Sequence, residues 1–242
     1  MIRAVFFDLY NTVARFDPPR EELQVEVCRE MGMTATAEGI ERGYVRADDY
    51  LARENARDPV FKRPDERLAV FWAEYERLVL EGAGIKAPLE LSGEVFARVR
   101  RKHYDLALFD DVLPTMDMLR QRGLVLGLLS NINRDIRQLT DNLRLTPYLD
   151  FAITPAEAGA EKPHPPIFLA ALRRAGCAPS EALHVGDQYH SDVVGARGVG
   201  INALLLDRTG HLEPAQYDVP LIRSLMEIQF HMGEPGPESL PE

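Results

Sequence analysis

Five short runs rich in apolar and β-branched residues recur along the chain. These runs are Val5–Leu9, Leu124–Leu129, Phe151–Thr154, Ala182–Val185 and Asn202–Leu206. From Leu124 onward they alternate with segments of helical periodicity, namely Arg134–Leu143, Pro166–Ala175 and Asp192–Arg197. Continuous apolar strands separated by helices are typical of a parallel sheet that is buried on both faces. We therefore predict an α/β core built on a doubly wound parallel sheet.

Between the first two runs the pattern changes to helices alone. The predicted helices are Glu21–Met31, Ala37–Arg57, Asp65–Leu80 and Gly93–Leu106. In the third of these, an apolar stripe at helical spacing predicts a face packed against neighbouring helices. We therefore predict a discontinuous α/β core at 1–15 and 110–230, a helical domain inserted at 16–109, and a flexible tail rich in Pro, Gly and Glu at 231–242.

The composition limits the partners that the chain can have. A formal net charge of −10 opposes general binding to nucleic acid or to anionic membranes, because phosphate groups repel a negative surface. An anionic small-molecule substrate is compatible with this charge, because cations within a cleft decide its binding. Cys28 and Cys177 stand apart without a metal-binding spacing, so we expect two small apolar side chains in a reducing compartment.

Targeting and membrane signals do not change this picture. No apolar run reaches the ~18 residues that a membrane helix needs, and the first apolar run is too short for a signal sequence. We therefore expect a cytoplasmic protein with a small-molecule substrate. No feature of the sequence indicates an oligomeric state.

Candidate chemistry lies at the ends of the predicted strands. In open α/β sheets, ligands bind at the carboxyl ends of the strands, near the switch in strand order. Polar residues follow four of the runs in turn: Asp8, Asn11 and Thr12; Ser130 and Asn131; Lys162; and finally Asp187 and Asp192. A carboxylate, a hydroxyl, a lysine and an acidic pair are therefore predicted to converge on one edge of the sheet.

These four segments, in this order, resemble the four motifs of the haloacid dehalogenase superfamily. The helical insert also stands where the cap domain of that superfamily belongs. Each motif alone is common, whereas all four in order at strand ends are a specific signal. The resemblance covers nearly the whole chain apart from the tail, and it implies a hydrolase with a Rossmann-like core and a helical cap.

The resemblance also implies catalytic and binding roles. Asp8 is expected to be the nucleophile, with Lys162 and Ser130 assisting it. Substrate contacts are expected from Asn11, Thr12, Ser130, Asn131 and Lys162. Backbone N–H groups of the turn Leu9–Thr12 would add a site for phosphate oxygens.

A Mg²⁺ ion is the cofactor that the resemblance implies. Its expected ligands are Asp8, the backbone carbonyl of Tyr10 and Asp187, with Asp192 behind them holding Ser130 and Lys162. Mg²⁺ suits such a set because it takes carboxylate and carbonyl oxygens and keeps several waters. A cation beside Asp8 would also lower the pKa of its carboxyl, and a nucleophilic carboxylate must be ionised.

Simpler structural roles compete with these. Asp8 can cap the turn that follows it, and Ser130 and Asn131 can cap the helix predicted to begin near Asp135. The six histidines show no metal-ligand spacing, so we expect them to be structural or exposed. The order of the four motifs favours the catalytic interpretation.

Tyr10 departs from the pattern of the phosphatases in this superfamily. Those phosphatases share a second Asp two positions after the nucleophile, which acts as general acid and then as base. The 2-haloacid dehalogenases instead carry an aromatic residue there, because a halide leaves without a proton, and they work without metal. The pair Asp187 and Asp192, in a GDxxxxD pattern, is typical of the Mg²⁺-dependent phosphatases.

Three functions remain open from the sequence. The favoured one is a Mg²⁺-dependent phosphatase acting on a small phosphorylated metabolite, with Tyr10 in place of the acid–base Asp. The second is a metal-independent 2-haloacid dehalogenase, for which Arg42 or Arg46 would have to hold the halide, although both read more simply as part of a solvated helix face. The third is a catalytically weak homologue that binds a phosphorylated metabolite or a protein.

Overall fold

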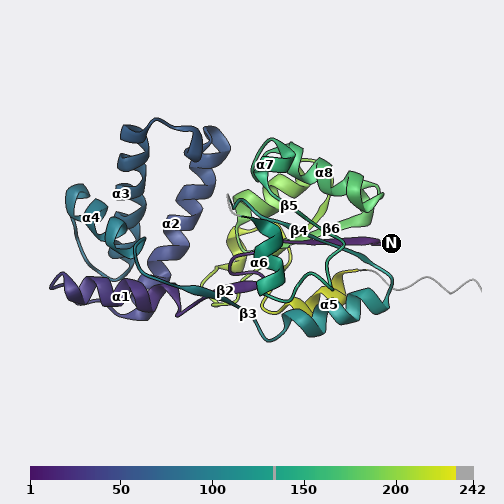
Figure 1. Cartoon of the computed structure of the whole chain (residues 1–242), viewed down its shortest axis with the longest axis horizontal. Coiled ribbons are helices and arrows are strands. Elements are labelled where there is room, and N and C mark those ends of the chain that lie inside the picture. Colours follow the sequence, from purple (N-terminus) through teal and green to yellow (C-terminus); the bar gives the residue numbers. More distant parts are fainter. Residues whose placement is uncertain (133–134, 233–242) are drawn as a thin grey trace, which may run out of the picture. The chain divides into compact units, whose positions relative to one another are not determined.

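The structure is a computed structural model that describes residues 1–132 and 135–232 (Figure 1). Two compact units make up the chain. One comprises Met1–Ala14 and Leu108–Glu242, and the other comprises Arg15–Ala107. We refer to them as the core unit and the helical unit.

The core unit is built on a six-stranded parallel sheet, which confirms the predicted α/β fold. Its order is β5-β4-β1-β6-β7-β8. The strands are β1 (Ala4–Phe7), β4 (Val125–Leu129), β5 (Phe151–Ile153), β6 (Ala182–Gly186), β7 (Asn202–Leu206) and β8 (Leu221–Ile222). The fully buried β1 lies between β4 and β6, in the register Phe7 opposite Leu128 and Val185. The chain builds outward from β1 in one direction and then crosses to the other side, so the switch in strand order lies beside β1.

Helices cover both faces of this sheet (Figure 1). α8 (Pro165–Ala175) packs on β4 and β5, and α5 (Val112–Gln121) packs on β4 from the opposite face, together with the 3₁₀ segment η5 (Leu225–His231). The shorter helical segments are α6 (Ile136–Asn142), α7 (Pro155–Ala158), η2 (Pro179–Glu181), η3 (Tyr189–Val194), α9 (Gly195–Arg197) and η4 (Pro214–Gln216). Phe6, Leu129 and Phe168 are fully buried between sheet and helices, so burial of these apolar side chains stabilises the layer arrangement.

The helical unit consists of α1 (Arg20–Glu30), α2 (Ala37–Arg57), η1 (Val60–Lys62), α3 (Asp65–Gly82) and α4 (Leu89–Val99). The predicted apolar stripe of α3 packs against α2 and α4. α2 and α3 approach closely because glycines meet where they cross. A Cβ atom at Gly43 would lie 2.1 Å from the carbonyl oxygen of Val79.

Several sequence predictions need correction. The helix predicted over Gly93–Leu106 is wrong at its end, because α4 stops at Val99 and Asp105–Leu108 forms strand β3. β3 pairs with β2 (Ala14–Asp17), a partner about ninety residues away that local periodicity does not reveal.

Three further differences concern helices and the tail. Helix α5 was not predicted. The turn around Asp192 is π-helical rather than α-helical. In the predicted tail, His231 ends η5 and Met232 is buried, while residues from 233 onward lie outside the described residues.

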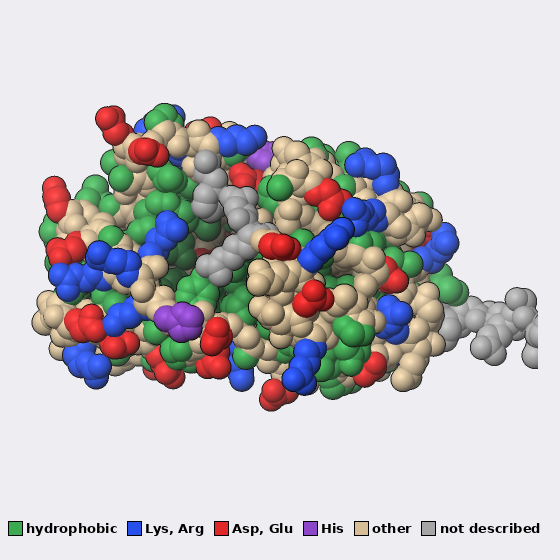
Figure 2. Space-filling model, viewed as in Figure 1, with side chains coloured by type: hydrophobic (Ala, Val, Ile, Leu, Met, Phe, Trp, Pro, Cys, Tyr) green, Lys and Arg blue, Asp and Glu red, His purple; other side chains and the backbone are tan. Residues whose placement is uncertain are grey.

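Charged side chains of both signs are interspersed on the face shown in Figure 2. Within the described residues, no helix combines the length and the apolar character that crossing a membrane requires.

Candidate active site

Asp8 directly follows the central strand β1. Its backbone N–H donates to the carbonyl of Val185 on β6 at 2.9 Å, so the strand pairing fixes the position of this residue. The turn that follows closes on itself, because the N–H groups of Val13 and Ala14 both donate to the Leu9 carbonyl. Asn11 adopts a φ of 56°, a left-handed conformation that Asn tolerates better than most residues. Its N–H donates to the Ala14 carbonyl and is therefore used within the turn, which narrows the predicted backbone site for phosphate oxygens.

Lys162 lies in the segment after α7 and contacts Asp8 at the end of β1. Its side chain is 2% exposed, and its Nζ lies 2.5 Å from Asp8 Oδ1 and 2.6 Å from Asp192 Oδ1. Asn131, from the end of β4, holds the lysine in place through the main chain. Its Nδ2 donates to the Lys162 carbonyl at 2.9 Å, and its Oδ1 accepts from the Lys162 N–H at 2.7 Å. The side chain of Asn131 thus positions Lys162, whereas a substrate contact by Asn131 stays a prediction.

Asp192 is built into a fixed, buried position. One oxygen accepts from Lys162 and lies 2.9 Å from His184 Nε2, and the other accepts from the Gln188 N–H at 3.0 Å. His184 is fully buried on β6. The carboxyl group needs the space beside Gly186, since a Cβ there would lie 2.2 Å from it. The π-helical turn η3 carries Asp192, and such irregular turns are frequent at functional sites.

Burial and neighbouring charges shift the pKa values of Asp192 and Asp8, the two carboxyl groups that contact Lys162, in opposite directions. Burial raises the pKa of Asp192, but the Lys162 charge and the His184 hydrogen bond outweigh it, so this pKa is well below its usual value. Burial also raises the pKa of Asp8, Lys162 offsets this only in part, and the Asp192 charge adds to the rise. The pKa of Lys162 is raised in turn, because the two carboxylates outweigh its own desolvation. Of these two carboxyl groups, Asp8 is therefore the one whose raised pKa a further positive charge beside it would lower.

Asp187 completes a cluster of three carboxyl groups. Oxygen atoms of Asp8, Asp187 and Asp192 lie within 4.8 Å of one another, and Asp187 also accepts from Asn11 Nδ2 at 3.2 Å. Among the described residues, Lys162 pairs with two of the three carboxyl groups, those of Asp8 and Asp192. A set of carboxylate oxygens of this kind fits a hard divalent cation such as Mg²⁺.

A comparison with protein-family models decides the family. The model for haloacid dehalogenase-like hydrolases matches residues 2–200, which include β1, the carboxyl cluster and Lys162. The chain belongs to the haloacid dehalogenase-like hydrolases.

Relatives of this hydrolase include both phosphatases and dehalogenases. It is 28% identical over 90% of its length to the human haloacid dehalogenase-like hydrolase domain-containing protein 3, covering 86% of that protein. It is also 28% identical to glyceraldehyde 3-phosphate phosphatase of Methanopyrus kandleri, covering 90% of each chain. Among solved structures, 2-haloacid dehalogenase from Pseudomonas syringae is 28% identical with a TM-score of 0.54, over 95% of this chain and 97% of that one.

Two further predicted site residues of the hydrolase, Ser130 and Thr12, are both buried. Ser130 is 1% exposed, at the end of β4, and its N–H donates to the Ile153 carbonyl. Thr12 is fully buried, and its hydroxyl has no hydrogen-bond partner among the described residues. The carbonyl of Thr12 accepts from Arg208, a residue that the sequence analysis missed. Reading the residues after the fifth apolar run, Asn202–Leu206, in the same way as the first four would have identified it.

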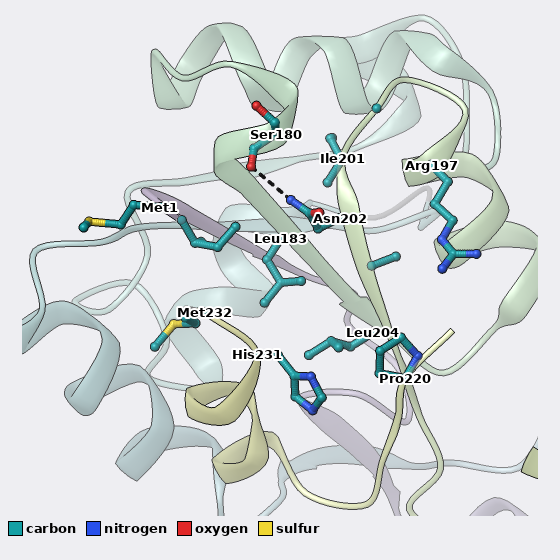
Figure 3. A pocket seen from close by; sticks show the side chains of 13 residues that line it. Met1, Ser180, Leu183, Arg197, Ile201, Asn202, Leu204, Pro220, His231 and Met232 are labelled. Atoms are coloured by element: carbon teal, nitrogen blue, oxygen red, sulfur yellow. Dashed lines mark hydrogen bonds between the residues drawn. The ribbon is translucent and has the colours of Figure 1, made fainter. Parts of the chain in front are cut away.

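A separate cavity of about 680 Å³ lies at the amino-terminal edge of the same sheet (Figure 3). Leu183, Asn202 and Pro220, at the starts of β6, β7 and β8, are among the residues that line it. One of its polar side chains has a structural partner, as Asn202 Nδ2 donates to the Ser180 carbonyl at 3.0 Å. The cavity contains none of the predicted site residues, because Asp8 and its partners lie at the carboxyl ends of the strands.

Proposed function

We propose that this hydrolase is a Mg²⁺-dependent phosphatase that acts on a small phosphorylated metabolite, with Asp8 as the nucleophile. The observation that carries the proposal is the cluster of three carboxyl groups around one buried lysine. A dehalogenase that works without metal has no need for two further carboxyl groups beside its nucleophile. The similarity to a protein named glyceraldehyde 3-phosphate phosphatase supports the same reaction and substrate class.

Asp8, Asp187 and the backbone carbonyl of Tyr10 would hold the Mg²⁺ ion. Asp192 contributes less to this set, because its oxygens already accept from Lys162, from the Gln188 N–H and from His184. When bound, Mg²⁺ neutralises the carboxylates and stabilises negative charge on a transferring phosphoryl group.

The protein's own residues then perform a two-step transfer. An oxygen of Asp8 attacks phosphorus, the bond to the leaving oxygen breaks, and an aspartyl phosphate forms. A water molecule then attacks this phosphorus, which releases inorganic phosphate and returns the carboxylate of Asp8. Lys162 holds positive charge against Asp8 and the phosphoryl oxygens, and Ser130 and the turn Asn11–Thr12 contribute hydrogen-bond donors. Asn131 acts by keeping Lys162 in place.

Tyr10 shapes the range of substrates. A phenol with a pKa of about 10 is a poor base at neutral pH, so neither the leaving group nor the water receives the usual assistance. Losing a positioned acid–base group costs about 10²–10⁴-fold in rate. We therefore expect good leaving groups, such as the carboxylate of an acyl phosphate, to react faster than alkyl phosphates.

A panel of acyl, aryl and alkyl phosphates, each assayed with Mg²⁺ and with EDTA, tests the proposal. We expect phosphate release with Mg²⁺, its loss in EDTA and in D8N, and its return when Mg²⁺ is restored to the wild type. Absence of Mg²⁺-dependent phosphate release across the panel would refute the proposal.

The second candidate is a 2-haloacid dehalogenase, favoured by Tyr10 and by the similarity to the Pseudomonas syringae enzyme. It predicts halide release from 2-chloropropionate that EDTA leaves unchanged. Parallel halide and phosphate assays on one sample separate the two reactions. A protein that catalyses neither but binds phosphate would fit the third function, a binding homologue.

A further inference from the structure

Arg208 lies in the loop after β7, outside the four motifs. Hydrogen bonds to the side chain of Asp207 hold the conformation of this loop. Asp207 is 3% exposed, and its Oδ1 accepts from the N–H groups of Gly210 at 2.8 Å and His211 at 3.2 Å. Gly210 has a φ of +77°, which glycine adopts without strain. The loop therefore presents the Arg208 side chain from a defined backbone position.

The guanidinium of Arg208 has three kinds of partner at once. Its Nη2 and Nε donate to the Thr12 carbonyl at 2.7 and 3.1 Å. Its Nη1 and Nη2 also donate to the two carboxylate oxygens of Asp111 at 3.1 and 2.9 Å. Its Cζ lies 3.9 Å from the centre of the Phe109 ring. The planar guanidinium forms an ion pair, donates hydrogen bonds to a carbonyl and stacks on a ring at the same time. A lysine side chain cannot form this combination of contacts.

Asp111 is itself held firmly. Its Oδ2 accepts from the Ser224 hydroxyl at 2.7 Å and from the Leu225 N–H at 2.8 Å. Burial raises the pKa of Asp111, but its bonds to Arg208, Ser224 and Leu225 outweigh burial and lower it, so this partner is ionised. Arg208 is thus anchored on α5 and on the segment that begins η5.

These partners lie at the two places where the chain leaves the core unit and returns to it. Thr12 precedes the last core residue of the first segment, Ala14, and Phe109 follows the first core residue of the second, Leu108. The Phe109 N–H also donates to the Val13 carbonyl at 3.2 Å. Arg208 therefore holds the chain where it leaves the core unit and where it returns. Through the Thr12 carbonyl, it also holds the end of the turn that follows Asp8.

We propose that Arg208 is a positioning residue for the reaction, acting through the Thr12 carbonyl on the turn that follows Asp8. This inference rests on the proposed phosphatase function, since the turn must be preorganised for a phosphoryl group. Arg208 itself donates to the Thr12 carbonyl, and no contact with substrate is required of it. Its loss is therefore expected to lower kcat by a larger factor than it raises KM.

The test uses R208K and R208A in the full chain, with R223A as the matched control. Arg223 is 58% exposed and lies 3.7 Å from Asp207, so R223A removes an arginine that contacts the same loop but does not pair with Thr12 or Asp111. A displacement of the turn by about 1 Å predicts a kcat loss of roughly 10²-fold in R208A, with a smaller loss in R208K. R223A is expected to keep the wild-type kcat, and each variant is assayed well below its melting temperature.

Hydrogen exchange of the peptide that covers residues 8–14 gives a second readout that does not depend on activity. We expect faster exchange there in R208K and R208A, and wild-type exchange in R223A. If R208A fails to fold, R208K and D111N provide the test of the inference. Both substitutions keep roughly the size of the side chain and weaken the pairing between Arg208 and Asp111. Wild-type kcat and wild-type exchange in R208K and D111N would overturn the inference. A wild type without phosphate release would instead refute the proposed function, and the exchange readout would still show whether Arg208 holds the turn.

Discussion

Tyr10 is the residue that most affects the proposed chemistry of this hydrolase. In the proposal, Asp8 is the nucleophile and the carboxyl cluster holds a cation, yet the position two residues after Asp8 carries a phenol where the phosphatases of the superfamily carry an acid–base Asp. Formation of the aspartyl phosphate is therefore expected to depend on how well the substrate's own group leaves without a proton.

Y10D tests this interpretation. Restoring a carboxyl group is expected to raise kcat for alkyl phosphates by roughly 10²-fold or more, because the leaving oxygen then receives a proton. Acetyl phosphate, whose leaving group needs no proton, should gain less, because only the attack of water on the aspartyl phosphate then receives new assistance. The measurement is Mg²⁺-dependent phosphate release from both substrates.

Y10F is the matched control, since it keeps the ring and removes only the hydroxyl. We expect it to resemble the wild type on both substrates. If Y10F abolished turnover while Y10D gained nothing, the phenol itself would take part in the reaction and this interpretation of Tyr10 would be wrong.

The sequence predicts which site residues lie close together, but it does not predict the hydrogen bonds that hold them in position. Asp8, Lys162 and Asp187 could be predicted to converge because the carboxyl ends of parallel strands share one edge. The two hydrogen bonds from Asn131 to the Lys162 main chain could not be predicted, because they join segments thirty-one residues apart through backbone groups. Arg208 is a similar case, since nothing local in the sequence links it to Thr12.

Among the elements, the crossing of α2 and α3 depends on glycine. Since a Cβ at Gly43 would lie 2.1 Å from a backbone oxygen, G43A must push the helices apart. We expect a loss of about 2 kcal/mol in the free energy of unfolding. On α4, G93A meets only Ala73 Cβ at 3.6 Å and should gain about 0.5–1 kcal/mol through helix propensity. Urea unfolding followed by Trp72, the sole tryptophan and part of α3, measures both, and an equal effect of the two substitutions would contradict this packing account.

A buried polar network joins three helices of the same unit. Glu76 on α3 is 1% exposed and accepts from Gln24 of α1, which in turn accepts from the Tyr44 hydroxyl of α2 at 3.0 Å. Burial raises the pKa of Glu76 from 4.5 to about 8, although the Gln24 hydrogen bond lowers it in part. At neutral pH the folded protein therefore keeps this carboxyl protonated.

This raised pKa predicts a pH-dependent stability. Between about pH 4.5 and 8 the folded state binds a proton that the unfolded state has released, so the free energy of unfolding falls as pH rises. The slope is at most ~1.4 kcal/mol per pH unit, and it levels above the folded pKa. E76Q cannot titrate, so its urea midpoint should be flatter across this window and exceed the wild-type value at about pH 9.

E74Q on the same helix is the control for Glu76. Glu74 is partly exposed, and its hydrogen bond to Arg77 lowers its pKa despite some desolvation, so it titrates below this window. E74Q should therefore follow the wild-type slope between pH 5 and pH 9. A wild-type slope in E76Q would show that Glu76 is ionised throughout.

The element predictions succeeded where burial dominates and failed where pairing is distant. The predicted strands of the core agree with the observed ones within about two residues, because burial of both faces leaves a continuous apolar run. The first two residues of β3, Asp105 and Leu106, were placed at the end of a predicted helix, although they belong to a strand that is exposed or half-buried throughout. Its pairing with β2, across the whole helical unit, is what makes it a strand.

For the whole molecule, the order of four weak motifs is enough to identify the family. Each motif alone is uninformative, but together they indicate the sheet and the place of its site, and the family comparison agrees. That the helical unit acts as a cap over this site, and which of its side chains select the substrate, stay predictions, because helical periodicity shows packing faces rather than ligand contacts. The central claim, that Asp8 is the nucleophile of a Mg²⁺-dependent phosphatase, therefore concerns the core unit alone.

The most direct test of that claim is a single-turnover experiment with acetyl phosphate, quenched rapidly in acid and analysed by peptide mass spectrometry. The account predicts one phosphoryl group on the peptide that contains Asp8, formed only with Mg²⁺, decaying as phosphate appears, and absent in D8N. Phosphate release at the wild-type rate without any modification of Asp8, or with equal speed in D8N, would contradict it.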